Sequence, residues 1–466
     1  MATPGQADRP DRGGGAGGGT AVLPARPGAE APPARATRRG PRSTPPRRLW
    51  TTGSVLALLA VLFGALTVTQ VVQSANAASS VVNHSQPLSD DAAQIFRSLA
   101  DADTTAATGF LQAGNETAAV QKQYNDDIRT ASTLLAQAAS STSASDPGQH
   151  EIQQLNAQLP VYTGYVEDAR SDDRQGLPLG GAYLRFASGQ LQGTMLVEAQ
   201  ALYTAETARL HQDYSDAQAL PWAAIGLGLV TLAALVWAQI RLFRQTNRVF
   251  NIGLVLATGA TAVALLWLVT AQSLSASDLR ASDSRGAAPL QVLNEARIKA
   301  LQCRGAENLN LVARGSTDDY ETAWSKDSAQ LVGKSGFLTQ ATAMTGTDPA
   351  AQQPIRAAAA AFTTWQQRHD KAKTANDNGD YTTAVDTTIG SVGQSTASTA
   401  DTTSAAFSSL DSNLNSAIGR ERANFRSLAA SGRGDTALLA EGAGVLALLA
   451  AAGALLGINR RAAEYR

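Results

Sequence analysis

The residue types that most often do chemistry in proteins are few in this chain, and they lie far apart. The single cysteine, Cys303, excludes an internal disulfide and any cysteine-pair metal site. The four histidines are widely separated, at His84, His150, His211 and His369. The serine-hydrolase, zinc-protease and phosphate-binding-loop motifs are missing from the sequence. We therefore expect no enzymatic activity, no metal and no cofactor.

Arginine is the next side chain to consider, because its guanidinium group can hold a ligand carboxylate through two hydrogen bonds. Four arginines fall on helices predicted for the first long polar segment: Arg97, Arg129, Arg170 and Arg185. Two interpretations stand. These side chains clamp a small-molecule carboxylate, or, as is more common, they pair with acidic neighbours on the helix surface.

Polar residues gather at the turns between the predicted helices. Exposed loops on a rigid scaffold often carry binding, so we expect a ligand or partner protein to bind there. The candidate residues are Asn115, Glu116, Asp172, Asp173, Arg174, Asp318, Asp319, Asn376, Asp377 and Asp380. The alternative is that these residues only form turns, which need Asp, Asn and Gly in any case.

Four apolar segments dominate the rest of the chain. They cover residues 51–72, 220–240, 250–271 and 437–458. Each has the roughly 20 residues that a helix needs to cross about 30 Å of hydrocarbon. We therefore predict a multi-pass protein of the cell membrane with four spans. In the last span, Gly453 and Gly457 have the spacing that permits close helix packing, with another span or with a second copy in a homodimer.

A cleaved leader is the alternative for the first apolar segment. Residues 75–77, Ala-Asn-Ala, resemble a small-residue cleavage site. However, the preceding apolar run, 51–72, is longer than the apolar core of a signal peptide. We favour an uncleaved anchor.

Arginines beside the apolar segments predict their orientation. Arginine-rich flanks occur at residues 41–50, 241–249 and 459–466. Such flanks stay in the cytoplasm, so residues 1–49, 241–249 and 459–466 are expected there and the long segments 73–219 and 272–436 outside. Segment 73–219 has seven basic and seventeen acidic residues, which argues against nucleic acid as a partner.

Residues 1–49 contain nine Pro, nine Gly and nine Arg, so they cannot bury a core and we expect disorder. Two interpretations stand for this tail. It docks a cytoplasmic partner, or it serves as a topology signal that also touches anionic membrane lipid.

Helical periodicity runs through both long polar segments. One example is the apolar stripe Ile95, Leu99, Ala102, Ala106 and Phe110. In the first segment we predict four helices, at 73–113, 116–142, 147–171 and 178–219. Four helices are also expected in the second segment, the last at about 381–430, with breaks expected at Gly390, Gly393 or the stretch 431–434. The predicted fold class is an all-α membrane protein, with four transmembrane helices and two extracytoplasmic antiparallel four-helix bundles in tandem.

Residues that typically end or start helices recur at a nearly constant distance along the chain, which indicates an internal duplication. The pairs are Gly114 and Gly315, Asp146-Pro147 and Asp348-Pro349, and Gly176 and Gly379. In each pair the second member follows the first at almost the same distance along the chain. The glycines are expected to end helices in a left-handed conformation, and the Asp-Pro pairs to start them.

A span, an antiparallel four-helix ectodomain and a returning span resemble the sensor half of bacterial chemoreceptors and sensor kinases. The segments FLQAGNE (110–116), ARSDDRQGLPLGGAYLRFAS (169–188) and NGDYTTAV (378–385) are similar to those of a more specific family. That family comprises actinobacterial four-span membrane sensors encoded beside a glutamate/glutamine-binding lipoprotein and protein kinase G. The resemblance implies a relay, in which the binding protein reports amino-acid supply and the membrane protein passes that state to the kinase.

Three functions remain open. The first is a non-enzymatic signal relay between an extracytoplasmic solute-binding lipoprotein and a cytoplasmic serine/threonine kinase. The second is a direct receptor that binds a small molecule inside its own helical bundles. The third is a structural scaffold of the cell envelope. Because only the short stretch 459–466 follows the last apolar segment, any output is expected through residues 1–49, the 241–249 loop or a partner.

Overall fold

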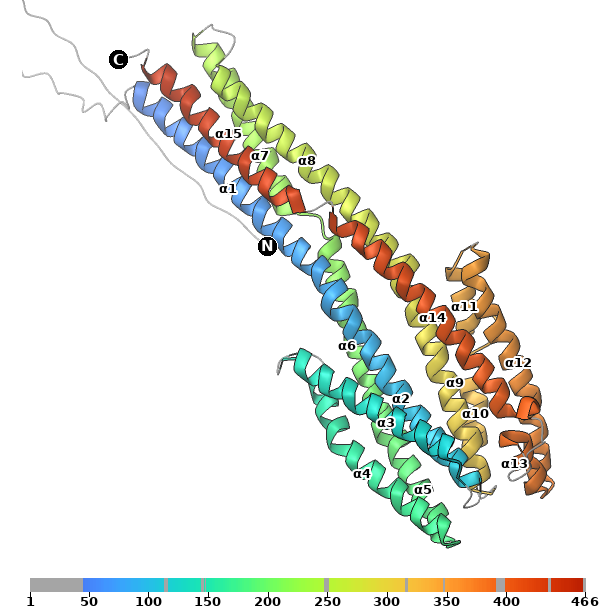
Figure 1. Cartoon of the computed structure of the whole chain (residues 1–466). Coiled ribbons are helices and arrows are strands. Elements are labelled where there is room, and N and C mark those ends of the chain that lie inside the picture. The colour runs from blue at the N-terminus through green and yellow to red at the C-terminus, as the bar shows by residue number, and fades with distance from the viewer. Residues whose placement is uncertain are drawn as a thin grey trace, which may run out of the picture.

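The computed structural model describes residues 45–112, 116–143, 146, 148–246, 251–314, 317–346, 348–390, 399–434 and 437–463. Within these ranges every regular element is a helix, and no strand occurs. The described part is elongated, with the apolar helices at one end and several shorter helices at the other (Figure 1). The prediction of an all-α protein is confirmed.

Two long helices run from the apolar end to the opposite end. The first consists of α1 (Pro45–Ser80), η1 (Val81–Ser85) and α2 (Gln86–Leu111). The second consists of α8 (Ile252–Ser282), η3 (Asp283–Ala287) and α9 (Ala288–Val312). Both η1 and η3 are single π-helical turns, and the next helix has proline in its first turn, Pro87 or Pro289. Proline cannot donate to the carbonyl four residues earlier and its ring clashes with that carbonyl. The wider π-helical turn accommodates the ring, so the helix continues.

The helices predicted for residues 73–219 are present with similar bounds. After α2 come α3 (Ala118–Ser141), α4 (Gln149–Arg174) and a continuous run of α5 (Leu179–Gln190), η2 (Leu191–Met195) and α6 (Leu196–Gln218). Gly176, between α4 and α5, has a φ of 70°, the left-handed conformation expected of a glycine helix end. The corresponding candidates Gly114 and Gly315 lie outside the described residues.

The predicted start of α4 at Asp146 is wrong. The N-cap is Gly148, with a φ of 89°. The Asp146 carboxylate instead accepts a hydrogen bond from the Ser143 N–H at 2.8 Å and lies 3.4 Å from the Arg209 guanidinium. Because its oxygens have these partners, Asp146 holds the α3–α4 turn against α6 rather than capping a helix.

The second polar segment departs from the four-helix prediction. The helix expected after α9 is split into α10 (Asp319–Ser328) and α11 (Phe337–Met344). Gly333, between them, has a φ of 101°. At Gly336 a Cβ would lie 2.7 Å from the Leu331 carbonyl oxygen, so the turn is too tight for a side chain there.

Two helix boundaries predicted for the rest of this segment are present in the structure. Helix α12 (Pro349–Asp377) begins as expected, with the Asp348 carboxylate accepting from the Ala350 N–H at 2.9 Å. The last helix breaks where expected, because α13 (Tyr381–Ile389) ends at Gly390, whose φ is 93°. Gly393 lies outside the described residues, and the described chain resumes with η4 (Thr399–Asp401) and α14 (Thr403–Gly434).

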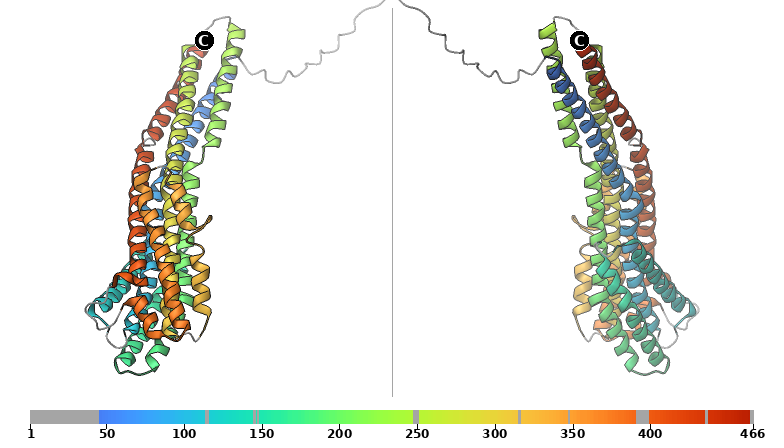
Figure 2. Two further views of the ribbon diagram at one scale, coloured as in Figure 1. Left: turned by 90° about the vertical axis from the view of Figure 1, so that its right-hand side faces the viewer. Right: turned by 90° about the vertical axis from the view of Figure 1, so that its left-hand side faces the viewer.

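Helices α2 and α9 join the two polar segments side by side (Figure 2). The apolar core around α2 includes Ile298, Leu301 and Leu311 of α9. The Asn308 amide donates to the Thr104 carbonyl oxygen at 3.1 Å, a bond that crosses the interface. The two segments therefore meet in the apolar core around α2, while a second apolar core lies within the second segment.

The apolar end contains α1, α8, α7 (Trp222–Thr246) and α15 (Ala437–Ala463). In the part of the chain that the structure describes, three helical stretches are long and apolar enough to cross a membrane: Trp50–Leu111, Leu179–Arg244 and Ile252–Val312. Helix α15 packs against both α1 and α8, and its described apolar stretch, Gly444–Asn459, is shorter. These features are compatible with a membrane protein.

The turns after α2, α4, α9 and α12 all lie at the end opposite the apolar helices (Figure 1). We call this the distal end; it comprises the described residues of turns 112–117, 175–178, 313–318 and 378–380. The turns after α3 and α11 lie nearer the apolar helices. Each polar segment thus presents two turns at the distal end.

The contact of α8 with α15 yields a stability prediction. A Cβ on Gly253 would lie 2.5 Å from the Gly453 carbonyl oxygen and 2.5 Å from the Gly457 Cα. We expect Gly253→Val to destabilise the detergent-solubilised protein by about 1–3 kcal/mol, as overpacking does. Thermal unfolding followed by circular dichroism measures the change. The control is Gly259→Val on the same helix, where a Cβ meets nothing within 4 Å. Equal melting temperatures of the two variants would contradict the close approach.

Candidate functional site

Three of the predicted distal residues of the first segment, Glu116, Asp173 and Arg174, lie at a partly buried ion pair of Arg170. Arg170 donates to Glu116 at 2.9 Å and to Glu167 at 2.8 Å, and its guanidinium lies 4.1 Å from the centre of the Tyr124 ring. Asp173 and Arg174 line a cavity of about 130 Å³ together with Glu116 and Arg170. The Asp172 carbonyl accepts from two N–H groups of the following turn. Asn115 lies outside the described residues.

The predicted distal residues of the second segment take part in turns and helix starts. Asp318 is the N-cap residue of α10 and Asp319 its first residue. The Asp380 carboxylate caps α13 by accepting from the Thr383 N–H at 3.1 Å. Asp377 pairs with Lys373 on the surface, and Asn376 accepts through its carbonyl from the Gly379 N–H. These contacts give the residues local structural roles.

Two of the four arginines considered as ligand clamps form ion pairs within the chain. Arg170 does so as described, and Arg129 donates to Asp126 at 2.7 Å on the surface of α3. Arg97 is partly buried, and its Nε has no hydrogen-bond partner among the described residues. It lines a small cavity of about 40 Å³ together with Arg297 and Arg422.

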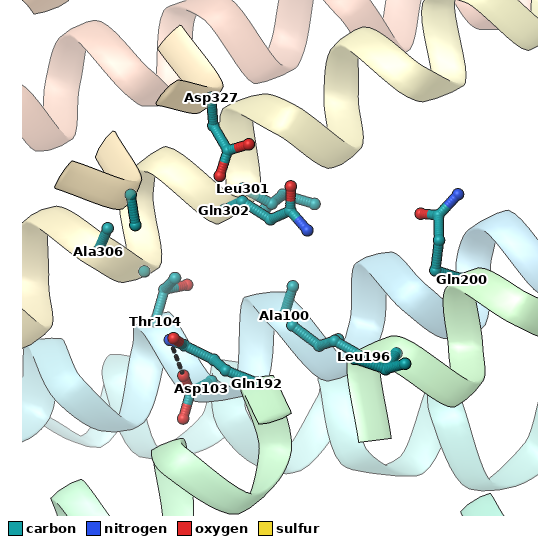
Figure 3. Close-up of a pocket in the computed structure, with 13 residues that line it drawn as sticks. Ala100, Asp103, Thr104, Gln192, Leu196, Gln200, Leu301, Gln302, Ala306 and Asp327 are labelled. Carbon is teal, nitrogen blue, oxygen red and sulfur yellow. Dashed lines mark hydrogen bonds between the residues drawn. The ribbon is translucent and has the colours of Figure 1, made fainter. Parts of the chain in front are cut away.

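A larger cavity lies between the two segments, with a volume of about 310 Å³. Helices α2 and α6 and the turn η2 form one side, and α9 and α10 form the other (Figure 3). Its polar lining consists of Asp103, Thr104, Gln192, Gln200, Gln302 and Asp327. Figure 3 shows side chains of this lining from both segments, with the Gln192 amide hydrogen-bonded to the Asp103 carboxylate on the side of the first segment and Leu196 and Leu301 nearby.

Asp103 is the most deeply buried polar group in this lining, at 2 % exposure. Its Oδ1 accepts from the Ser188 hydroxyl at 2.6 Å and the Tyr162 hydroxyl at 3.3 Å, and its Oδ2 accepts from the Gln192 amide at 3.3 Å. Burial raises the pKa of Asp103, and these three hydrogen bonds partly offset that effect. All three donors are neutral, so within the described residues they supply no positive charge to balance the carboxylate.

The carboxylate on the opposite side of the cavity is balanced. The Lys299 ammonium donates to Asp327 at 3.0 Å and to the Gln302 amide oxygen at 2.9 Å. The ammonium therefore neutralises Asp327 and orients Gln302. The two sides of the cavity therefore differ: among the described residues Asp327 has a cationic partner, and Asp103 has neutral donors alone.

A second buried polar cluster lies inside the second segment, around Glu307. Arg304 pairs with this carboxylate, which also accepts from the indole N–H of Trp365 at 3.1 Å and the hydroxyl of Thr403 at 3.0 Å. His369 Nδ1 lies 3.0 Å from Glu307. Burial opposes ionisation of Glu307, but the charge of Arg304 and the hydrogen bonds lower its pKa overall. The carboxylate is thus held charged in the core.

His369 links this cluster to α10. Its ring stacks on Trp324, with 3.7 Å between ring centres, and its Nε2 lies 3.4 Å from the Glu321 carboxylate. Burial lowers the pKa of His369, but hydrogen bonds to Glu307 and Glu321 outweigh burial and raise the pKa to about 9. An imidazolium that donates from both nitrogens fits this arrangement.

The sequence analysis missed Asp103 and Glu307, although each leaves a signal. Asp103 follows Leu99 by four residues, so it lies on the apolar stripe of its predicted helix. Glu307 follows Cys303 by four residues on a buried stripe of the same kind. An acidic residue on the buried face of a helix needs a hydrogen-bond or ion-pair partner, but only the tertiary structure identifies that partner. Cys303 itself is buried.

The fold and these clusters define a class of protein. It is elongated and all-helical, with helices of membrane-spanning length at one end and a packed helical region with buried polar sites at the other. Residues 77–215, less than half of the chain, match the family model of an actinobacterial sensor domain. The match spans η1 and α2 to most of α6. It supports an actinobacterial sensor protein and suggests a role in sensing or signalling. No curated protein and no solved structure matches the chain.

The contacts of Glu307 predict that its substitution by glutamine strongly destabilises the protein. Glu307→Gln leaves the Arg304 guanidinium buried without its anion and leaves protonated His369 with Glu321 alone, so we expect the free energy of unfolding to fall by about 3–5 kcal/mol. Urea unfolding of the detergent-solubilised protein measures it. The control is Asp377→Asn, which removes a surface ion pair and should change stability by no more than about 1 kcal/mol. Losses of similar size in the two variants would contradict the role of Glu307.

His369 predicts a pH dependence of stability. Its pKa in the folded protein, about 9, exceeds the ordinary value of 6.5, so its contribution is fully present below pH 6.5 and is lost as pH rises through 9. We expect up to about 3 kcal/mol of stability to disappear over this range. His369→Gln should flatten this part of the pH profile, whereas the exposed His150→Gln should not. A profile unchanged by His369→Gln would refute the assignment.

Proposed function

We propose that this protein is a non-enzymatic transmembrane sensor that carries an extracytoplasmic event into the membrane along continuous helices. The observation that carries the proposal is the course of the two long helices, Trp50–Leu111 and Ile252–Val312, from apolar segment to distal end. A helix of this kind transmits a shift or tilt over its length with little loss, because its backbone is hydrogen-bonded throughout. The sensor-domain match over 77–215 supports the same role.

The proposed topology has four spans, at 51–72, 220–240, 250–271 and 437–458, with both termini in the cytoplasm. Its support is the arginine content of the flanks 41–50, 241–249 and 459–466, since positive flanks remain cytoplasmic. The contacts of α15 with α1 and α8 support a fourth span beside the others. Segments 73–219 and 272–436 are then extracytoplasmic, and the distal end points away from the membrane.

The two extracytoplasmic segments are proposed to be tandem four-helix units that arose by duplication. One support is the spacing of η1 and η3, each of which is followed by a proline. They are separated by nearly the same number of residues as the paired helix-ending and helix-starting residues. Another is that Gly176 and Gly379, which form one of those pairs, both adopt a left-handed backbone, with φ of 70° and 82°. The split of α10 from α11 is where the second unit diverges.

The π-helical turns suggest how a shift would pass between sensor and span. Such turns carry one extra residue and leave backbone hydrogen bonds rearranged locally, so the helix can change direction there. Both η1 and η3 lie between the apolar and the polar parts of their helices. A displacement of α2 against α9 would therefore reach α1 and α8 through these two joints.

The proposed input is an extracytoplasmic solute-binding lipoprotein that reports amino-acid supply, and the proposed output is a cytoplasmic serine/threonine kinase. The resemblance described above motivates both partners. On the outside, the polar distal end offers a contact surface; on the inside, residues 1–49 and the 241–249 loop offer one. A structural scaffold of the envelope is the competing function, and it differs in having partners that do not respond to nutrient.

Cross-linking in native membranes tests the proposed input. Photoreactive residues replace Asp173 and Asp319, which lie next to distal turns, and a control replaces Met344, the last residue of α11, which is 41 % exposed. We expect mass spectrometry to find the solute-binding lipoprotein at the distal positions only, in amounts that differ between amino-acid-rich and starved cells. Fixed, nutrient-independent partners at all three positions would favour the scaffold.

Deletion of residues 1–49 tests the proposed output. We expect the phosphorylation of the kinase's targets to lose its response to amino acids while the truncated protein still reaches the membrane. Phosphoproteomics measures the response, and replacement of residues 1–40 by an unrelated Pro/Gly-rich sequence that keeps the flank 41–50 controls for topology. An intact response in the truncated protein would refute the tail as the output.

A further inference from the structure

We infer that the 310 Å³ cavity between α2 and α9 binds a small organic cation of the primary-amine class. The inference rests on the sensing role proposed above, to which it adds a ligand bound by the chain itself. The charge, the size and the position of this cavity support the inference.

The charge of the lining favours a cation. Among the described residues, the side chains that line the cavity include two carboxylates, three amides and a threonine, and no Lys, Arg or His. Lys299 already neutralises Asp327. Asp103, at 2 % exposure, has hydroxyl and amide donors only. A buried carboxylate without a countercharge is costly, and this cost raises the pKa of Asp103. A bound ammonium group would supply the countercharge and favour the ionised carboxylate.

The same lining disfavours an anionic ligand. A carboxylate in this cavity would lie near Asp103 and Asp327, and the donors available to it are neutral amides and hydroxyls. Like charges at short range in a partly buried site repel strongly. The arginines that would hold a carboxylate line other cavities, at Arg170 and at Arg97.

The size and the apolar lining limit the cation to a small organic molecule. The volume of about 310 Å³ lies at the lower end of the range for small-molecule sites, which is roughly 300–1,000 Å³. Leu196, Val197 and Leu301 offer methyl groups that would cover a short methylene chain. A hydrated metal ion would gain nothing from these groups, whereas an alkylamine would gain from both parts of the lining.

The position of the cavity connects binding to the sensor. Its lining comes from α2 and α6 of the first segment and from α9 and α10 of the second. A ligand that contacts Asp103 on one side and Gln302 on the other would stabilise one arrangement of the two segments. Both long helices contribute residues to the cavity, through α2 and α9. A bound ligand would therefore change the relative positions of α2 and α9, which is the displacement that the proposed relay uses.

Isothermal titration calorimetry of the full chain in lipid nanodiscs tests the inference. The probes are 1,4-diaminobutane, 1,4-butanediol and succinate, which share a four-carbon length and differ in charge. We expect heat for the diamine and none for the diol or the dianion. Asp103→Asn should weaken diamine binding about tenfold to a hundredfold, the usual loss for a charge-assisted hydrogen bond. The control Asp126→Asn removes an exposed carboxylate on α3 and should leave binding unchanged.

A second variant keeps the inference testable if Asp103→Asn fails to fold. Val197 lines the cavity at 57 % exposure, so Val197→Trp places bulk at the mouth without entering the core. It should weaken diamine binding as well. No heat with the diamine, equal binding of the diol, or undiminished binding in these variants would overturn the inference. Diamine binding with no cellular response to amino acids would refute the relay alone, whereas a working relay without diamine binding would refute the cavity assignment alone.

Discussion

The packing of α2 against α9 is the contact on which the rest of the polar region depends. Each helix continues an apolar segment, and each forms a wall of its own segment's core. Because Ile298 and Leu301 enter the core around α2, neither segment can move without changing the other. The same contact creates the cavity beside Asp103 and carries the Asn308 to Thr104 hydrogen bond across the interface.

The two buried acids of this region illustrate different solutions to one physical problem. Glu307 is surrounded by Arg304, His369, Trp365 and Thr403, so its charge is balanced inside the core and its role is structural. Asp103 has three neutral donors and borders a cavity. Burial of both costs solvation, but among the described residues only Asp103 has no cationic partner, so burial raises its pKa. That difference is why one cluster is interpreted as scaffold and the other as a binding site.

The long helices explain how a chain of this kind can join two distant regions. Pro87 and Pro289 would interrupt an ordinary α-helix, yet the π-helical turns before them let each helix continue from apolar to polar surroundings. At the apolar end, glycines at 253, 453 and 457 bring α8 and α15 into backbone contact. One end of the molecule is therefore closely packed through small residues, and the other is held by aromatic and charged side chains.

The sequence by itself determined the helical class, the apolar segments and the bounds of the helices in 73–219, because period, Gly and Pro act locally along the chain. It also located the turns that carry Glu116, Asp173 and Asp380. Only the tertiary structure decided that Arg170 pairs with Glu116, that α10 and α11 separate at Gly333 and Gly336, and that Asp103 accepts hydrogen bonds from Tyr162, Ser188 and Gln192 beside a cavity. These contacts join groups that are far apart in the sequence. A periodic pattern identifies which face of a helix is buried, but it does not identify the helix that packs against that face.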